Sequence, residues 1–202
     1  MSPLLINLFA RFDSLASHTH SAIVHSCGSD SLPSDLAVYL SVQTLRKHLG
    51  PDVRTARSVS AFELQGGFSG GTLKTAYTIL DKVPRNTIME SLQDHYLSPA
   101  SGAASPPTKY VYSLPHATPL ISGGFFIMST MNRGIVHRTR GLLETNPSMQ
   151  SFQYGPDFQY EEFMIAPNRV AGAIMSMAVF TLGFCLSASS SVRHLFLTDS
   201  FC

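Results

Sequence analysis

The chain has 202 residues, which is enough for one medium-sized domain, or parts of two, around a buried core. Its formal net charge is +1, and its 14 Lys and Arg residues are scattered, so we expect no nucleic-acid partner. Only 13% of the residues are charged, whereas about 25% is usual for soluble proteins. This low charge predicts large buried faces, a lipid-facing surface or a missing partner domain.

In chain order, apolar residues at helical spacing first predict a helix over residues 4–17. Residues 22–27 are expected to form a short buried strand. Ser34 is then expected to cap a helix that Gly50-Pro51 ends. The leucines of this helix are predicted to lie mostly on one face: Leu36, Leu40, Leu45 and Leu49.

A strand is predicted over residues 53–65, and glycines at 66–71 separate it from a helix over 72–82. Residues 98–108 are rich in Pro, Ser and Ala and predict an exposed loop. The other predicted elements are a short helix at about 86–95, a strand at 109–114, a buried segment at 124–128, a basic amphipathic helix at 132–143 and a strand at 158–165.

Residues 170–188 form an apolar run without charge, close to the roughly 20 residues that span a bilayer. Small residues in it, Gly172, Ala173, Ala178 and Gly183, suit close helix packing in protein or in lipid. We place a buried or membrane-surface helix slightly ahead of a membrane span, because the run is short and its flanks are weak.

The three cysteines, Cys27, Cys185 and Cys202, are widely spaced and form no Cys-x-x-Cys motif. They predict neither a zinc site nor a dithiol redox pair, and a reducing, intracellular compartment is the simpler expectation. No other metal-ligand spacing stands out, so we predict no metal site. The apolar residues 1–10 lack a basic start and a cleavage site, and they are not interpreted as a secretory signal.

The loop between the predicted strand 22–27 and the following helix is a candidate binding site, since ligands of open α/β sheets bind where strands lead into helices. Its candidate residues are His25, Cys27, Gly28, Asp30 and Ser31. Asp30 could line the ligand crevice or form a local turn, and we weigh these two alternatives equally. His25 could donate a proton, but a hydrogen-bonded structural role is favoured. Cys27 is expected to be buried and unreactive.

A second candidate site is the glycine-rich loop, whose residues Gly67, Ser69, Gly70, Gly71 and Thr72 precede a predicted helix. Free backbone N–H groups at a helix N-terminus, joined by hydroxyls, can hold a phosphate or a carboxylate. The alternative is a flexible turn that lets a helix and a strand approach closely. The loop is not a P-loop, because the required Gly-Lys-Ser/Thr is absent.

Two further groups of charged residues have simpler explanations. The basic cluster Arg133, His137, Arg138 and Arg140 could contact anionic lipid head groups, but a solvated helix face is the commoner explanation. Glu161 and Glu162 are adjacent, so on a strand they face opposite sides and do not form a carboxylate pair.

Several ordered motifs resemble the saccharopine dehydrogenase-like oxidoreductases, a group that includes the trans-acting enoyl reductases of lipid and polyketide assembly. The resemblance covers roughly residues 8–196. The motifs are His25-Ser-Cys-Gly-Ser-Asp-Ser-Leu-Pro-Ser-Asp-Leu36, Gly67-Phe-Ser-Gly-Gly-Thr-Leu73, Gly124-Phe-Phe126, Asn132-Arg-x-Ile-Val-x-Arg138 and Tyr154-Gly-Pro-x-Phe-x-Tyr-Glu-Glu-Phe-Met164.

This resemblance implies an α/β fold in which a Rossmann domain binds NAD(P) and a second, α+β domain is inserted. Residues 1–35 would then be the last part of the Rossmann domain, and 36–165 the second, substrate- or dimer-type domain. Residues 166–202 would be an apolar C-terminal helix and a short tail. In this family, the stretch matching the apolar run accompanies membrane or lipid-droplet association.

The chain departs from the family at two points. The residues that should precede Met1, with the first glycine-rich turn, are absent, and Ser29 stands where the family usually has an aromatic residue. NAD(P) is therefore implied by the resemblance, while this chain alone is expected to bind it very weakly or not at all.

The leading functional prediction is an NAD(P)-dependent oxidoreductase, incomplete as given, acting on an acyl or lipid-like molecule with a reducible double bond. Catalytic residues are not identified, and a homodimer stays open. The alternatives are a non-catalytic protein of a membrane or lipid-droplet surface, or an inert truncated product.

Overall fold

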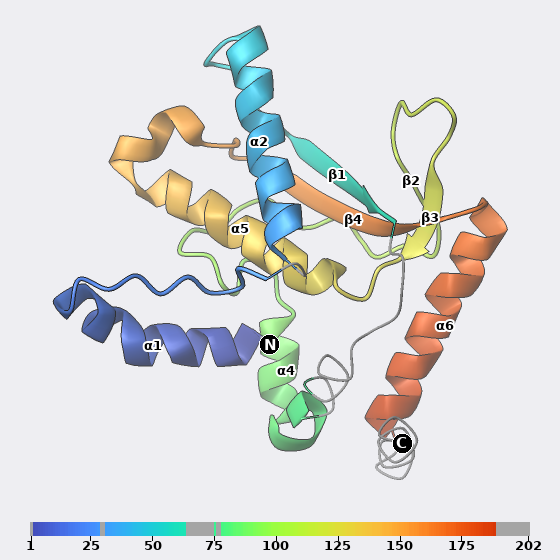
Figure 1. The fold of residues 1–202 in the computed structure, drawn as a ribbon. Helices are drawn as coiled ribbons and strands as arrows, with labels where there is room; N and C mark the ends of the chain where they lie inside the picture. The colour runs from blue at the N-terminus through green and yellow to red at the C-terminus, as the bar shows by residue number, and fades with distance from the viewer. Residues whose placement is uncertain (1, 29–30, 64–74, 76–77, 189–202) are drawn as a thin grey trace. The chain divides into compact units, whose positions relative to one another are not determined.

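The protein is a mixed α/β chain, and its computed structural model describes residues 2–28, 31–63, 75 and 78–188 (Figure 1). Four strands form one sheet in the order β1-β4-β3-β2, with β3 antiparallel to both β2 and β4. The elements are α1 (Ser2–His18), α2 (Leu32–Leu49), β1 (Arg57–Phe62), α4 (Arg85–Ser91), β2 (Tyr112–Ser113), β3 (Ser122–Phe125), α5 (Ser129–Thr145), the 3-10 helix η1 (Pro147–Phe152), β4 (Gln159–Ala166) and α6 (Arg169–Ala188). The predicted mixture of helices and strands is confirmed.

The chain divides into two units, which are described separately below. The first unit comprises residues 1–60, 90–107 and 128–161, and the second comprises residues 61–89, 108–127 and 162–202. The division at residues 35 and 165 that the family resemblance implies stays a prediction.

In the first unit, α2 begins earlier than the sequence predicts. Ser31, not Ser34, occupies the N-cap position, and its side chain makes no capping hydrogen bond. Pro33 lies in the first turn, where a backbone N–H has no acceptor within the helix, so the N–H that proline lacks breaks no helical hydrogen bond. The helix ends at Gly50 as predicted, and the φ of +111° at this residue suits glycine.

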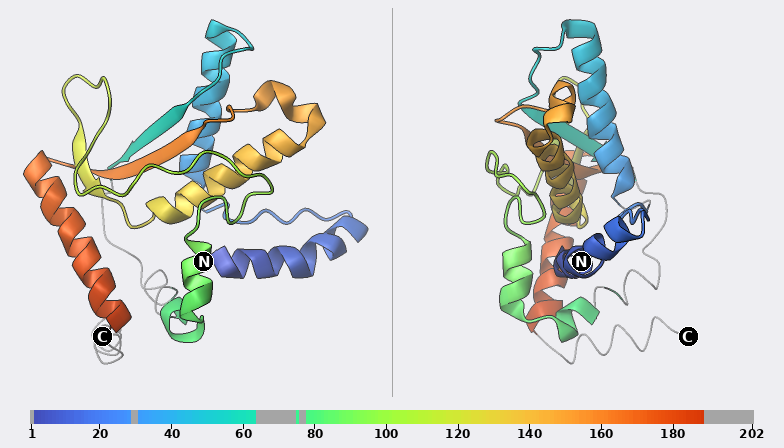
Figure 2. Two further views of the ribbon diagram at one scale, coloured as in Figure 1. Left: turned by 180° about the vertical axis from the view of Figure 1, so that it is seen from behind. Right: turned by 90° about the vertical axis from the view of Figure 1, so that its left-hand side faces the viewer.

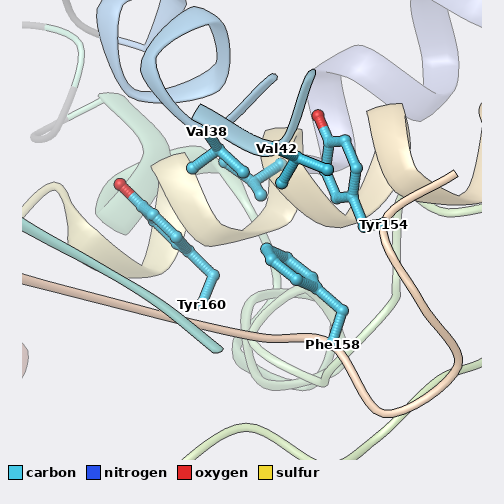
Figure 3. Packing of buried hydrophobic residues seen from close by; sticks show 6 residues of the cluster. Val38, Val42, Tyr154, Phe158 and Tyr160 are labelled. Carbon is cyan, nitrogen blue, oxygen red and sulfur yellow. The ribbon is translucent and has the colours of Figure 1, made fainter. Parts of the chain in front are cut away.

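The core of the first unit lies where α2 crosses α5 (Figure 2). Figure 3 shows the two α2 valines pointing toward the aromatic rings that flank the start of β4. Each side chain in the cluster is at most 1% exposed, and full burial of one such aliphatic side chain contributes roughly 1.5–3 kcal/mol. The cluster consists of Val38, Val42, Val136, Tyr154, Phe158 and Tyr160.

The prediction that the α2 leucines form one face is wrong. A step of five residues separates Leu40 from Leu45 and turns the side-chain direction by about 140° around the helix axis. The buried face instead follows a regular step of four, through Ser34, Val38 and Val42. The four leucines, Leu36, Leu40, Leu45 and Leu49, are 45%, 59%, 42% and 67% exposed.

In the second unit, α6 packs against β3 (Figure 1). The closest approach is made by glycines, and the rings of Phe125 and Phe180 pack beside it. A Cβ on Gly172 would lie 2.5 Å from the Gly123 carbonyl oxygen, so the two backbones are in direct contact. The fully buried Ser176 hydroxyl accepts a hydrogen bond of 2.7 Å from the Phe125 N–H. The prediction that Gly172 allows close helix packing is therefore confirmed.

The opposite side of α6 is exposed. Val170, Ile174, Met177 and Phe184 recur on this side, and each is 60% exposed or more. We name these four residues the α6 apolar stripe. The helix is therefore not buried on all sides. Within the described residues, no helix has both the length and the hydropathy that crossing a bilayer requires.

The strand predicted over residues 22–27 is not formed. Residues 21–24 have no regular secondary structure, and a turn follows at 25–26. Ile23 and Val24 are 47% and 71% exposed, whereas a strand of an open sheet is stabilised by a paired neighbour and a buried face. Residues 22–27 therefore do not provide the piece of a Rossmann sheet that the resemblance implies.

Most other predicted elements are present with shifted ends. The helices at 4–17 and 132–143 and the strands within 53–65 and at 158–165 are confirmed. The strand predicted at 109–114 is reduced to β2, the short helix ends at Ser91, and the segment expected to be buried includes Ile127, which is 45% exposed. Residues 98–108 have no regular structure, as predicted. The glycine-rich stretch 66–71 lies outside the described residues.

Candidate functional site

The first candidate loop is joined to α5 through Ser31. The Ser31 hydroxyl donates a hydrogen bond of 2.9 Å to the side-chain oxygen of Asn132, and both residues are buried. This contact ties the start of α2 to the first turns of α5. The role in cofactor binding proposed for Ser31 stays a prediction, and the hydroxyl is engaged in helix packing.

Asp35 lies one turn further along α2, where the helix dipole favours a carboxylate. Its Oδ2 accepts a hydrogen bond of 2.7 Å from the Thr139 hydroxyl, while its Oδ1 is buried without a partner among the described residues. Burial raises the pKa of Asp35, and the Thr139 hydrogen bond opposes this rise. Asp35 therefore links α2 to α5 by its side chain as well as lying in the first turn.

The phenol of Tyr154 is a second buried polar group beside this contact. Its hydroxyl has no hydrogen-bond partner among the described residues. Burial, together with the charges of Asp35 and Tyr39, raises the pKa of Tyr154. The phenol thus stays protonated, and at 1% exposure it is part of the core and not a group that meets solvent.

The residues before α2 lie differently from the prediction. The His25 ring packs edge-on against Phe9, with ring centroids 4.7 Å apart, and its buried Nε2 has no hydrogen-bond partner among the described residues. Cys27 is exposed, so the prediction that it is buried is wrong. The reason is the turn at Ser26, whose φ of +55° redirects the chain, in place of a strand that would carry Cys27 into a sheet. Gly28 is exposed as well.

The remaining candidate residues lie outside the described part of the chain. They are Asp30 of the first loop and Gly67, Ser69, Gly70, Gly71 and Thr72 of the second. Their roles stay predictions.

The described residues do not form the phosphate-binding unit of a dinucleotide site. Such a unit needs a strand that leads through a glycine-rich turn into a helix N-terminus. α2 is preceded by a turn and not by a strand. The described residues also contain no group of three or more His, Cys, Asp or Glu placed to hold a metal ion.

Two of the four basic residues of α5, His137 and Arg140, are not part of the solvated or lipid-contacting cluster that the sequence suggests, whereas Arg133 and Arg138 are partly exposed. Arg140 is 3% exposed and donates hydrogen bonds to the carbonyl oxygens of Ser101 (3.1 Å) and Gly155 (3.3 Å). Its guanidinium also pairs with Glu144 at 2.9 Å. His137 is 1% exposed. Both predicted roles are wrong for these two residues, because the loop after α4 and the turn before β4 cover them.

Sequence reasoning missed a cleft of about 380 Å³ near the carboxyl ends of α2 and α5. Seven of its eleven lining residues are charged or carry a side-chain amide, so it suits a polar ligand group better than an acyl chain. The only available sequence signals were the arginine in the last turn of α2 and the Gly-Pro turn of the last family motif. The lining residues are Arg46, Pro51, Asp52, Arg54, Arg140, Glu144, Gln150, Gln153, Tyr154, Gly155 and Pro156.

The arginines of the cleft differ in what they already bind. Arg140 is committed to backbone carbonyls and Glu144, as described above. Arg46 donates to the carbonyl oxygens of Gln153 and Pro51, while its buried Nε has no partner among the described residues. Arg54 is exposed, and no described residue pairs with its guanidinium. Arg54 is therefore the cation of the cleft with the most freedom to meet a ligand.

Comparisons with known proteins find similarity to mycobacterial proteins. The chain is 30% identical over 171 residues to "Putative trans-acting enoyl reductase Rv2449c" of Mycobacterium tuberculosis strain H37Rv, and equally to "Putative trans-acting enoyl reductase MT2525" of strain CDC 1551. No family model and no solved structure matches the chain. Each match covers 80% of this chain but 39% of the relative, so the chain spans about two fifths of the length of these proteins. The similarity supports the trans-acting enoyl reductase part of the sequence resemblance.

Proposed function

We propose that this chain is part of an oxidoreductase of the trans-acting enoyl reductase type, and that it supplies the side that meets the acyl substrate. The observation that carries the proposal is the 30% identity over 171 residues to the two mycobacterial proteins. The saccharopine dehydrogenase-like fold and the lipid or polyketide-type substrate belong to the same proposal and rest on the sequence motifs.

NAD(P)H would supply the hydride that reduces the carbon–carbon double bond in such an enzyme. The described residues lack a strand, turn and helix arranged to hold a dinucleotide. The proposal therefore assigns the cofactor to residues other than the described ones, and assigns to the described ones the binding and orientation of the substrate.

The cleft near the ends of α2 and α5 is the proposed contact for the polar end of that substrate. Its volume of about 380 Å³ is within the usual range of roughly 300–1,000 Å³ for ligand sites. Its polar lining suits a thioester or a phosphate of an acyl carrier group. Arg54 is the proposed anchor because an arginine binds phosphate oxygens in a bidentate manner.

Calorimetry of the purified chain with 2-decenoyl-coenzyme A tests this proposal. Arg54→Gln is expected to weaken binding by at least about tenfold, because a hydrogen bond to a charged group contributes about 1.5–3 kcal/mol. Lys47→Gln is the matched control, since Lys47 is also an exposed cation near the end of α2 but does not line the cleft. Absence of binding by the unmodified chain, or equal effects of the two variants, would contradict the proposal.

The α6 apolar stripe supports a second candidate function, attachment to a lipid surface. An exposed apolar helix face can lie at the boundary between head groups and acyl chains, with strength that follows the buried apolar area. Vesicle flotation tests this idea. Ile174→Ser combined with Met177→Ser should abolish flotation, whereas Leu40→Ser, which alters a leucine of similar exposure on α2, should not. Flotation unchanged by the double substitution would remove this candidate.

A further inference from the structure

Two histidines stack on each other where the segment after α4 covers α5. The rings of His95 and His137 are 4.2 Å apart between centroids and inclined by only 15°. His137, in the middle of α5, is 1% exposed. His95 has a φ of +61°, a left-handed conformation that non-glycine residues seldom adopt.

The ring nitrogens of this pair are poorly satisfied. Neither nitrogen of His137 has a hydrogen-bond partner among the described residues, and the same holds for Nδ1 of His95. Nε2 of His95 lies 3.0 Å from the carbonyl oxygen of Ala103. A neutral imidazole carries one donor and one acceptor, so a buried histidine without partners is less favourable than a phenyl ring of similar size. Packing alone does not explain an imidazole at position 137.

Charged and titratable groups face the pair from both elements. Asp94 and Tyr96 line the same small cavity from the segment after α4, and Arg133 lines it from α5. Asp94 lies 3.6 Å from the Arg133 guanidinium and also accepts hydrogen bonds from Ser105. Arg140 is the other cation whose charge acts on His137. A positive charge on His137 would therefore be close to two arginines and to His95, with the carboxylate of Asp94 as the one opposing charge among the described residues.

Contacts on both sides of the ring stack also hold this segment on α5. The Leu97 carbonyl accepts a hydrogen bond of 3.0 Å from Arg138, and the Ser101 carbonyl accepts one of 3.1 Å from Arg140. Leu97 is buried beside Gly134, and Ser98 and Pro99 lie close to Gly141. The ring stack lies among these contacts, at the middle of α5, so a change in the stack should disturb the contacts next to it.

We propose that the stacked His95–His137 pair is a pH-sensitive latch that holds residues 92–107 on α5 near neutral pH and releases them on acidification. In the closed state His137 is neutral and stacks on the His95 ring. In the open state His137 reaches water and takes up a proton. The latch does not rest on the function proposed above.

The direction and size of the effect follow from linkage. Burial, followed by the charge of His95, lowers the pKa of His137 from 6.5 to about 3. The open state therefore binds more protons than the closed state between these two values, and closure weakens as the pH falls below about 6.5. Between pH 8 and pH 5 the opening equilibrium rises about thirtyfold. The lowered pKa of Asp94 places its own titration below this window.

Amide hydrogen exchange of the full chain at pH 5 to 8, corrected for the intrinsic pH dependence of exchange, tests the latch. Protection of residues 92–107 should fall about thirtyfold from pH 8 to pH 5 in the unmodified chain. Protection of residues 36–44 in α2 serves as the internal reference and should change far less. A constant protection of residues 92–107, or an equal fall in both regions, would overturn the proposal without any variant.

Two variants sharpen the result. His137→Phe keeps a stacking ring without a titratable nitrogen, so its protection of residues 92–107 should vary less than threefold over the same range. His48→Gln removes an exposed histidine of α2 and should keep the full thirtyfold fall. A thirtyfold fall that persists in His137→Phe would contradict the role of this residue.

Discussion

The contact between α6 and β3 makes a sharp prediction for Gly172→Ala. The new Cβ would lie 2.5 Å from the oxygen and 2.6 Å from the carbon of Gly123, and 3.1 Å from the nitrogen of Gly124. All three atoms belong to the backbone, so no side chain can move aside, and α6 must retreat by roughly 1 Å to reach ordinary contact distance. Overpacking costs about 1–3 kcal/mol, and the backbone neighbours put this contact at the upper end of that range, while helix propensity returns about 1 kcal/mol. We expect a net loss of about 2 kcal/mol.

Gly183→Ala is the matched control for this substitution. Gly183 lies in the same helix, and outside that helix no atom of the described residues lies within 4 Å of a Cβ built there. Only the propensity gain remains, so this variant should be as stable as the unmodified chain or more stable by up to about 1 kcal/mol.

Urea unfolding distinguishes these two outcomes. The chain has no tryptophan, so unfolding is followed by far-ultraviolet circular dichroism. A loss of 2 kcal/mol should lower the urea midpoint by roughly 1 M, given the usual denaturant dependence of about 1–3 kcal/mol per M. Exchange of the Phe125 amide, which donates to Ser176, should accelerate in Gly172→Ala. A Gly172→Ala variant with an unchanged midpoint would refute the close approach of helix and strand.

Two further predictions concern the first unit. Val42→Ala truncates a side chain that is 1% exposed and should lower the free energy of unfolding in urea by about 2 kcal/mol. Leu40→Ala, at a position that is 59% exposed, should lower it by less than about 0.5 kcal/mol. Equal losses would contradict the assigned buried face of α2. The raised pKa of Asp35 means that the folded state binds more protons above pH 3.8, so stability is lost as the pH rises through the folded pKa. The free energy of unfolding of Asp35→Asn, measured in urea relative to that of the unmodified chain, should therefore increase from pH 3 to pH 7. A difference that decreases over this range would contradict the burial of the carboxylate.

Periodicity and stop signals predicted the helices and the longer strands well. Gly50-Pro51 ends α2, and the pattern of residues 158–165 identifies β4, because both signals are local. The failed strand at 22–27 shows the limit of such reasoning. Its apolar residues fit a strand, but a strand forms only where another strand accepts its hydrogen bonds, and this depends on the rest of the fold.

The candidate site was predicted less well, for physical reasons. A hydroxyl before a helix suits both a cap and a ligand contact, and the sequence alone does not show that Ser31 meets Asn132. The basic pattern of α5 suggested a solvated face, whereas Arg140 is buried by backbone carbonyls contributed by two distant loops. The cleft near Arg54 likewise depends on segments far apart in sequence. Such tertiary burial leaves no local periodic signal.

The central claim of the proposed function is that this chain by itself meets the acyl substrate and does not hold the nicotinamide cofactor. Titration of the purified chain with NADPH in a calorimeter tests it most directly. The expected result is no detectable heat of binding at NADPH concentrations where 2-decenoyl-coenzyme A binds. NADPH binding with micromolar affinity would contradict the claim, because it would place a complete dinucleotide site in this chain.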